Sequence, residues 1–162
     1  YDVLSFIGAS TGMRRGEIER IQKDDVIVKD GKKWLKVRGT KSIYSVREVP
    51  LSDETEKAIN SFLLEDIQQR DWKRAVLNTG QKIGLGQKYI EDNGIVFHSF
   101  RKLYKTLLTQ ANLNTSLIET LMGHSTQNQK SNDVERIYFV AESADLRGVH
   151  DKVVEVLKYL TG

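Results

Sequence analysis

The sequence has 162 residues, of which 39% are hydrophobic and 29% charged, and its net charge is +3. These values fit one globular domain with a buried core. They exclude a disordered chain and, since no apolar run is long enough, a membrane-spanning one. The absence of cysteine excludes disulfides and thiolate metal sites. The small positive charge permits an anionic partner such as a nucleic acid without requiring one. The chain begins at Tyr1 within a helical pattern, so we interpret it as a fragment without its N-terminal part.

The first two predicted helices meet at a glycine. Apolar residues over 2–10 predict a short helix that ends at Gly12. Thr11 is the expected N-cap of the next helix, on which Arg14 and Glu17 lie three residues apart and share a face. An arginine beside a helix N-terminus suits a phosphate. By itself, however, the pair is more typical of a solvated surface ion pair.

The residues from Asp25 to Pro50 follow the period of β-strands. The Asp30-Gly31 pair is a tight-turn signal between the first two β-branched or aromatic runs. Lys41 falls in the turn between the second and third runs. Such a lysine is normally solvated, but at a hairpin tip it could be lowered onto a ligand. The pattern predicts a small antiparallel sheet with strands near 26–28, 34–37 and 46–49.

Two further helices are predicted between residues 51 and 97. An apolar stripe over 58–67 predicts a core-packing helix without chemistry. The glycine-containing region 71–93 predicts one short helix near 87–92. Trp72 and Tyr89 could stack on nucleic-acid bases, but both are more typical of core packing.

The helix predicted from His98 to Ala111 carries the first pair of residues that indicates chemistry. His98 and Arg101 lie three residues apart, so their side chains share one face near the helix start. Alone this pair is a weak signal, because an HxxR pattern occurs by chance in many proteins and a single helical histidine is usually structural.

A second histidine follows the next predicted helix. Asn114 or Ser116 is the expected N-cap, and Ser116 and Glu119 have capping-box spacing. Gly123 suits the C-terminal cap, which places His124 just beyond the helix end.

The C-terminal part combines a polar stretch with two helices. Residues 126–133 are wholly polar and predict an exposed, mobile loop. A short helix over 134–140 presents Tyr138, and an amphipathic helix over 145–160 follows. This last helix packs either on its own subunit or on a neighbour, and the pattern favours neither.

The order and spacing of these motifs resemble the tyrosine recombinases, the phage-integrase-like site-specific recombinases. The resemblance covers the whole chain, residues 1–162, as the catalytic domain. It implies a mostly α-helical fold with a small antiparallel three-stranded β-sheet (α+β). Family members usually carry a core-binding domain before this one, and we expect that domain to be missing from the fragment. The matching segments are Thr11-Gly12-Met13-Arg14-Arg15-Gly16-Glu17-Ile18 (first arginine box), Gly39-Thr40-Lys41 to Val49-Pro50-Leu51 (strand pair with the catalytic lysine), His98-Ser99-Phe100-Arg101 (HxxR box), Leu121-Met122-Gly123-His124-Ser125 (Leu-Gly-His box) and Arg136-Ile137-Tyr138 (nucleophile).

The resemblance also implies which residues form the site. The polar stretch between His124 and Tyr138 is longer than the family usually shows, so delivery of the tyrosine within its own protomer or to a neighbour stays open. Tyr159 is a weaker alternative nucleophile, because no family motif surrounds it. The implied catalytic residues are Arg14, Lys41, His98, Arg101, His124 and the nucleophile Tyr138, with Glu17 in support.

This residue set suits the cleavage of a phosphodiester without a metal ion. Guanidinium groups match phosphate oxygens and stay charged. A lysine can protonate the leaving 5′-oxygen, and a histidine can shuttle the tyrosine proton. The sequence contains no HExxH, CxxC or P-loop motif. We therefore expect no metal, no other cofactor and no ATP requirement.

The implied function is DNA integration or excision by cutting and rejoining strands through a 3′-phosphotyrosine intermediate, as in the integration of a viral genome or another mobile element. The implied partners are double-stranded DNA and other copies of the chain in a homo-tetramer, in the cytoplasm on nucleoid or host-cell DNA and not on a membrane. Two alternatives stay open. One is strand cutting of the type IB topoisomerase kind, and the other is a catalytically silent DNA-binding module.

Overall fold

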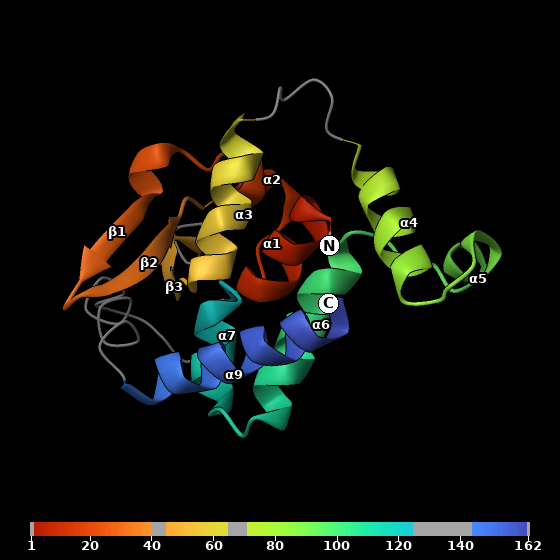
Figure 1. Ribbon diagram of the computed structural model, residues 1–162. Helices are drawn as coiled ribbons and strands as arrows, with labels where there is room; N and C mark the ends of the chain where they lie inside the picture. The colour runs from red at the N-terminus through yellow and green to blue at the C-terminus, as the bar shows by residue number, and fades with distance from the viewer. Residues whose placement is uncertain (1, 40–44, 65–70, 125–143, 162) are drawn as a thin grey trace.

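The computed structural model describes residues 2–39, 45–64, 71–124 and 144–161. Within these ranges helices dominate, and a three-stranded antiparallel sheet lies at one side of them (Figure 1), which confirms the predicted fold class. No helix in these ranges combines the length and apolar character needed to cross a membrane. In chain order the elements are α1 (Val3–Thr11), α2 (Arg15–Ile18), the 3₁₀ helix η1 (Lys23–Asp25), β1 (Val26–Lys29), β2 (Lys32–Val37), β3 (Arg47–Pro50), α3 (Asp53–Leu64), α4 (Trp72–Lys82), α5 (Gln87–Asp92), α6 (His98–Gln110), α7 (Thr115–Leu121) and α9 (Ala144–Thr161).

Helix α1 is the centre of the packing. It contacts α3, α4, α6 and α9, and its residues from Leu4 onward are buried, as expected of a helix covered on all sides. The Asp2 carboxylate caps its start by accepting from the Leu4 and Ser5 amides at 3.1 and 3.2 Å. Gly12 ends it with a φ of +64°. The helix end therefore stands where the sequence predicts it.

The predicted capping role of Thr11 is wrong. Thr11 is the last residue of α1, and its hydroxyl donates to the Ile7 carbonyl at 2.6 Å. Arg14 is the N-cap of α2 instead. The reason is that Gly12, with its left-handed backbone, ends the first helix after Thr11, so the N-cap of the next helix stands three residues further on, at Arg14.

The sheet has the order β1-β2-β3 and matches the predicted strands. Asp30 and Gly31 adopt φ values of +50° and +70° in the β1–β2 hairpin, which suits a type I′ turn. Trp34 pairs with Pro50 and Leu35 with Val49 between β2 and β3. The buried side chains of this strand pair join the core formed with α1 and α3.

The region between α3 and α6 differs from its prediction. Helix α4 forms in addition to the expected α5, and both lie on the opposite side of the molecule from the sheet in Figure 1. Trp72 is buried as expected, but Tyr89 is 53% exposed, so the core assignment of Tyr89 is wrong. The sequence obscures α4 because its buried face includes the small residues Ala75 and Gly80. A Cβ at Gly80 would stand 2.3 Å from the Ile90 side chain of α5, which accounts for the close helix packing.

Helix α9 confirms the predicted C-terminal helix and packs on its own chain. Its contacts are with α1, α6 and β3, and Val153, Val154 and Leu157 are buried among the core residues. His150 is completely buried beside Tyr104 of α6, with the Tyr104 hydroxyl 3.3 Å from His150 Nδ1. The helix expected over 134–140 lies outside the described residues.

The buried imidazole of His150 predicts a loss of stability in mild acid. Burial, and then the charge of Arg147, lower the pKa of His150 to about 3, so the folded protein keeps it neutral while the unfolded chain takes up a proton near pH 6.5. This stability is therefore complete above pH 6.5 and declines below it, by about 2 kcal/mol between pH 7 and pH 5. Urea unfolding of the wild type and of His150→Phe and His150→Gln at both pH values measures it. If the variants lost as much unfolding free energy between pH 7 and pH 5 as the wild type, protonation of His150 would not be the cause of the loss.

Candidate functional site

Arg14 and Glu17 form a reciprocal contact at the start of α2. The Arg14 amide donates to Glu17 Oε2 at 2.7 Å, and Arg14 Nη1 donates to Glu17 Oε1 at 2.9 Å. The Glu17 side chain is completely buried, whereas that of Arg14 is 24% exposed. Burial would raise the pKa of Glu17, but hydrogen bonds from Arg47 and from the Arg14 backbone hold it below its ordinary value. Glu17 is therefore an anion that orients Arg14 at the surface, rather than half of a solvated pair.

Arg101 lies in the first turn of α6 with only 2% of its surface exposed. Its guanidinium donates to the carbonyls of Gly12 and Met122, and its Nη2 lies 3.2 Å from His124 Nε2. Burial, followed by the charges of Arg47 and Arg14, lowers the pKa of Arg101 to about 9, which leaves it cationic at neutral pH. These contacts use three of the five guanidinium N–H groups and include no carboxylate. Arg101 is thus a buried cation able to accept an anion as a further partner.

His124 is held by a turn at the end of α7. The Gly123 amide donates to the Thr120 carbonyl and the His124 amide to the Glu119 carbonyl, both at 2.9 Å, which is the Schellman arrangement. Gly123 has the left-handed φ of +63° that this turn requires, as the sequence predicts. Asn114 provides the N-cap of α7, accepting from the Ser116 amide at 2.8 Å.

Glu119 orients the imidazole of His124 instead of completing the predicted capping box. Its Oε2 lies 2.5 Å from His124 Nδ1, and its Oε1 accepts from Lys105 at 2.6 Å. Those bonds, first that from Lys105 and then that from His124, lower the pKa of Glu119. With Nδ1–H donated to Glu119, Nε2 of a neutral ring faces the Arg101 guanidinium as an acceptor.

His98 is the first residue of α6 and is exposed. Partial burial lowers the pKa of His98, and the nearby charges of Arg101, Lys102 and Arg14 lower it further. The charge of Arg14 thus lowers the pKa of both His98 and Arg101. A negatively charged group bound among them would relieve this repulsion.

The structure brings five of the predicted site residues together and leaves two outside its description. Lys41 and Tyr138 lie outside the described residues, so their places in the site stay predictions. The side chain of the alternative tyrosine, Tyr159, also lies outside them, although its backbone belongs to α9. The five that share one region are Arg14, Glu17, His98, Arg101 and His124.

Sequence reasoning missed Arg47, the first residue of β3. It is 1% exposed and binds Glu17 through two bonds of 3.0 Å, from Nη1 to Oε1 and from Nη2 to Oε2. A signal was present, because Arg47 stands in the period-2 register of the buried residues Val49 and Leu51. A charged residue at an inward strand position requires a buried partner.

The fit of Gly123 against Arg47 predicts a costly substitution. A Cβ at Gly123 would stand 2.9 Å from Arg47 Nη1. We expect Gly123→Ala to lose about 2–3 kcal/mol of unfolding free energy, through left-handed strain and crowding together. Gly94→Ala is the matched control, since Gly94 has a φ of +59° and its Cβ would meet nothing within 4 Å. Chemical denaturation of the two variants should give the larger loss of unfolding free energy for Gly123→Ala. Equal losses would show that Arg47 moves away from the added Cβ at little cost.

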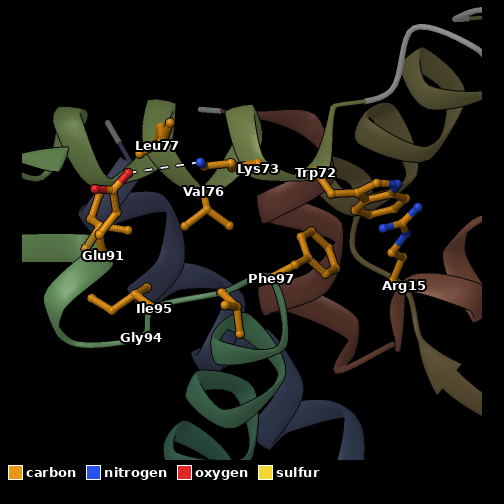
Figure 2. A pocket seen from close by; sticks show the side chains of 11 residues that line it. Arg15, Trp72, Lys73, Val76, Leu77, Glu91, Gly94, Ile95 and Phe97 are labelled. Atoms are coloured by element: carbon orange, nitrogen blue, oxygen red, sulfur yellow. Dashed lines mark ion pairs between the residues drawn. The ribbon is translucent and has the colours of Figure 1, made fainter. Parts of the chain in front are cut away.

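A separate apolar cavity of about 450 Å³ lies between α4, α5 and the segment before α6. Trp72 and Phe97 meet edge to face in it at 4.5 Å between ring centroids, and the Arg15 guanidinium lies 5.2 Å from the centre of the Trp72 ring (Figure 2). Lys73 and Glu91 form an ion pair at the opposite end. None of the five site residues that the structure describes lines this cavity, so it is distinct from the basic cluster around Arg101.

The comparison with known families decides which family the chain belongs to. The model of the phage integrase family matches residues 5–138. The chain belongs to the phage integrase family. As a member of this family it acts on DNA in recombination, and DNA is its partner. Searches of curated proteins and of solved structures found no match.

The match of this integrase-family chain includes all seven predicted site positions, from Arg14 to Tyr138. In the part of the chain that the structure describes, no group of three or more His, Cys, Asp or Glu residues is arranged to hold a metal ion. The chemical groups gathered at the site are instead guanidinium and imidazole groups, which bind and neutralise phosphate oxygens.

Proposed function

We propose that the chain is a site-specific recombinase whose tyrosine cuts DNA and stays attached to it through a 3′-phosphotyrosine bond. The observation that carries the proposal is the convergence of Arg14, Arg101, His98 and His124 around the start of α6. Besides burial, the positive charge of Arg14 lowers the pKa values of both Arg101 and His98, and that of Arg101 lowers the pKa of His98. A scissile phosphate is the anion that such a cluster would bind.

The proposed cleavage step assigns one task to each group. The hydroxyl oxygen of Tyr138 attacks the phosphorus, and the bond from phosphorus to the 5′-oxygen breaks. Arg14 and Arg101 donate to the non-bridging oxygens, where a preorganised donor is worth on the order of 3 kcal/mol. Lys41 gives a proton to the departing 5′-oxygen, and His98 or His124 takes the tyrosine proton.

Rejoining is the reverse of this step on a new strand. A free 5′-hydroxyl attacks the phosphotyrosine, and the tyrosine leaves with the proton returned to it. Because the phosphotyrosine bond keeps the free energy of the broken phosphodiester, the cycle requires no ATP. In this mechanism the protein groups alone stabilise the charge on phosphate, so it proceeds without a metal ion.

The proposed assembly is a homo-tetramer on two DNA sites. Exchange between two duplexes requires four strands to be cut, and each cut uses the tyrosine of one subunit. In this assembly residues 1–162 serve as the catalytic domain beside a separate core-binding domain. Whether Tyr138 serves its own protomer or a neighbour is an outcome that mixed tetramers of Arg101→Ala and Tyr138→Phe chains would decide.

A library of nicked duplexes with randomised sequence around the nick tests the proposal. A nick just 3′ of the cut lets the short 5′-hydroxyl fragment diffuse away, so the covalent intermediate accumulates. We expect a protein–DNA adduct on a denaturing gel in the presence of EDTA and without ATP. Tyr138→Phe should abolish it, and Tyr159→Phe should not. The DNA recovered from the adduct then identifies the preferred sequence.

The alternatives give different results in the same system. An adduct that persists in Tyr138→Phe would contradict the nucleophile assignment. DNA binding without an adduct on any library member would favour a silent binding module. Relaxation of supercoiled plasmid without resolution of a four-way junction would favour topoisomerase-like cutting, whereas junction resolution supports the recombinase.

A further inference from the structure

Arg47 makes contacts that differ in kind from those of the two site arginines. Its Nε donates to the Leu121 carbonyl at 2.5 Å, Nη1 donates to Glu17 Oε1 and the Ser45 carbonyl at 3.0 Å each, and Nη2 donates to Glu17 Oε2 at 3.0 Å. Four of its N–H contacts thus go to protein oxygens, and its side chain is only 2% exposed. The Glu17 carboxylate already neutralises the charge of Arg47, so Arg47 does not offer its guanidinium to a phosphate, unlike the equally buried Arg101.

The partners of Arg47 belong to three separate segments of the site. Glu17 is the residue that holds the Arg14 guanidinium and amide. Leu121 ends α7, directly before the turn that carries His124. Ser45 lies shortly before β3, in the connection between β2 and β3, and the sequence of this connection includes Lys41. One side chain thus bonds to three segments, namely the one that carries Arg14 and Glu17, the one that leads to His124 and the one that leads into β3.

The packing around Gly123 shows how closely this contact is fitted. The position of a Gly123 Cβ would be 2.9 Å from Arg47 Nη1 and 3.3 Å from the Ser45 Cα. The turn before His124 therefore rests directly on the Arg47 guanidinium and on the backbone before β3. A shift of Arg47 would displace the Arg14 side through Glu17 and the His124 side through this turn.

We propose that Arg47 is a positioning residue of the recombination reaction, which sets the Arg14 guanidinium and the His124 turn in register with each other. The inference rests on the proposed function and adds a residue to it. Stability alone does not require this ion pair, because apolar side chains of similar volume often replace a buried pair without loss. A planar guanidinium with several fixed N–H directions holds three segments at once, which neither an ammonium nor an apolar side chain can do.

The test separates positioning from folding by replacing the pair as a whole. The double variant Glu17→Leu/Arg47→Met removes both charges and keeps an apolar filling, and Arg47→Lys keeps the charge but not the fork. We expect both to form the adduct about 100-fold more slowly than the wild type under single-turnover conditions at saturating DNA, because misplacement of about 1 Å costs that much. Their Kd for the same nicked duplex should stay within about threefold, since Arg47 is bonded within the protein and is not among the groups proposed to contact phosphate.

Arg147 offers the matched control. Its guanidinium also donates to two backbone carbonyls, those of Lys33 at 2.8 Å and Leu51 at 3.1 Å, but on the side where α9 meets the sheet. Arg147→Lys therefore loses two structural guanidinium bonds away from the site and should cleave at the wild-type rate. All rates are measured well below the unfolding midpoint of each variant.

A double-mutant cycle with Arg14 checks the route of the effect. If Arg47 acts through Glu17 on Arg14, then Arg47→Lys should cost at least tenfold less in an Arg14→Ala background than in the wild type. Wild-type cleavage by either folded Arg47 variant, or an undiminished penalty in the Arg14→Ala background, overturns the inference alone. A wild-type chain that forms no adduct with any duplex overturns the proposed function and this inference together.

Discussion

Arg101→Lys is expected to slow adduct formation by about 10² to 10³-fold at saturating DNA, the loss typical of one preorganised donor at a developing charge. The variant keeps a positive charge at this position. It loses the fork that lets one side chain bond to the Gly12 and Met122 carbonyls and face His124 at the same time. An ammonium has three donors in a different geometry, so it cannot hold these partners and also meet a phosphate. Single-turnover measurement with a nicked duplex reports this loss.

The pH dependence of the same reaction provides a second readout. Burial and neighbouring cations lower the pKa of Arg101 to about 9, which still leaves its guanidinium charged at neutral pH, so titration of Arg101 should not change the wild-type cleavage rate between about pH 6 and pH 8. Arg147→Lys again serves as the control for a guanidinium-to-ammonium change away from the site. Cleavage by Arg101→Lys within about threefold of the wild type would show that Arg101 is structural and does not bind the scissile phosphate.

Glu17→Gln is expected to cause the largest loss of stability among single substitutions in the site, about 3–5 kcal/mol of unfolding free energy. The change leaves the Arg47 charge buried without its anion, and an uncompensated buried charge carries a penalty of this size. Arg14 loses its orienting carboxylate at the same time, so cleavage should also slow. Urea unfolding measures the first effect and the nicked duplex the second.

Glu19→Gln is the matched control for this substitution. Glu19 pairs with Arg15 at 2.8 Å, but both side chains are exposed, so the same carboxylate-to-amide change should cost no more than about 0.5 kcal/mol. The pKa of Glu17 lies below its ordinary value, so its contribution to stability is present above that value and is lost as the pH falls through the folded pKa. Glu17→Gln should therefore show a weaker acid dependence than the wild type. Equal stability of the two variants would contradict the role of Glu17 as the counter-ion of Arg47.

Much of the fold could be predicted because short-range rules control it. Gly12 and Gly123 end their helices in the left-handed region, and Asp30-Gly31 closes the hairpin, as their types predict. Helix α4 was missed because its buried face has only two large apolar residues, Trp72 and Val76, beside the small Ala75 and Gly80, so no long stripe distinguishes it from a loop. The exposure of Tyr89 was missed for a related reason, since aromatic character does not state which side of a short helix faces the core.

The sequence by itself determined the motif order and the helix and strand types, which depend on residue types within a few positions of one another, where backbone hydrogen bonds and capping decide the outcome. Its resemblance to the tyrosine recombinases implied the candidate site residues, namely Arg14, Lys41, His98, Arg101, His124 and Tyr138, with Glu17 in support. Only the tertiary structure decided that Glu17 pairs with Arg47, thirty residues away, and that Glu119 turns to His124 instead of capping α7. It also decided that α9 packs on its own chain. Such choices depend on which groups folding removes from water together, because a buried charge is stable only beside a partner that the path of the whole chain delivers.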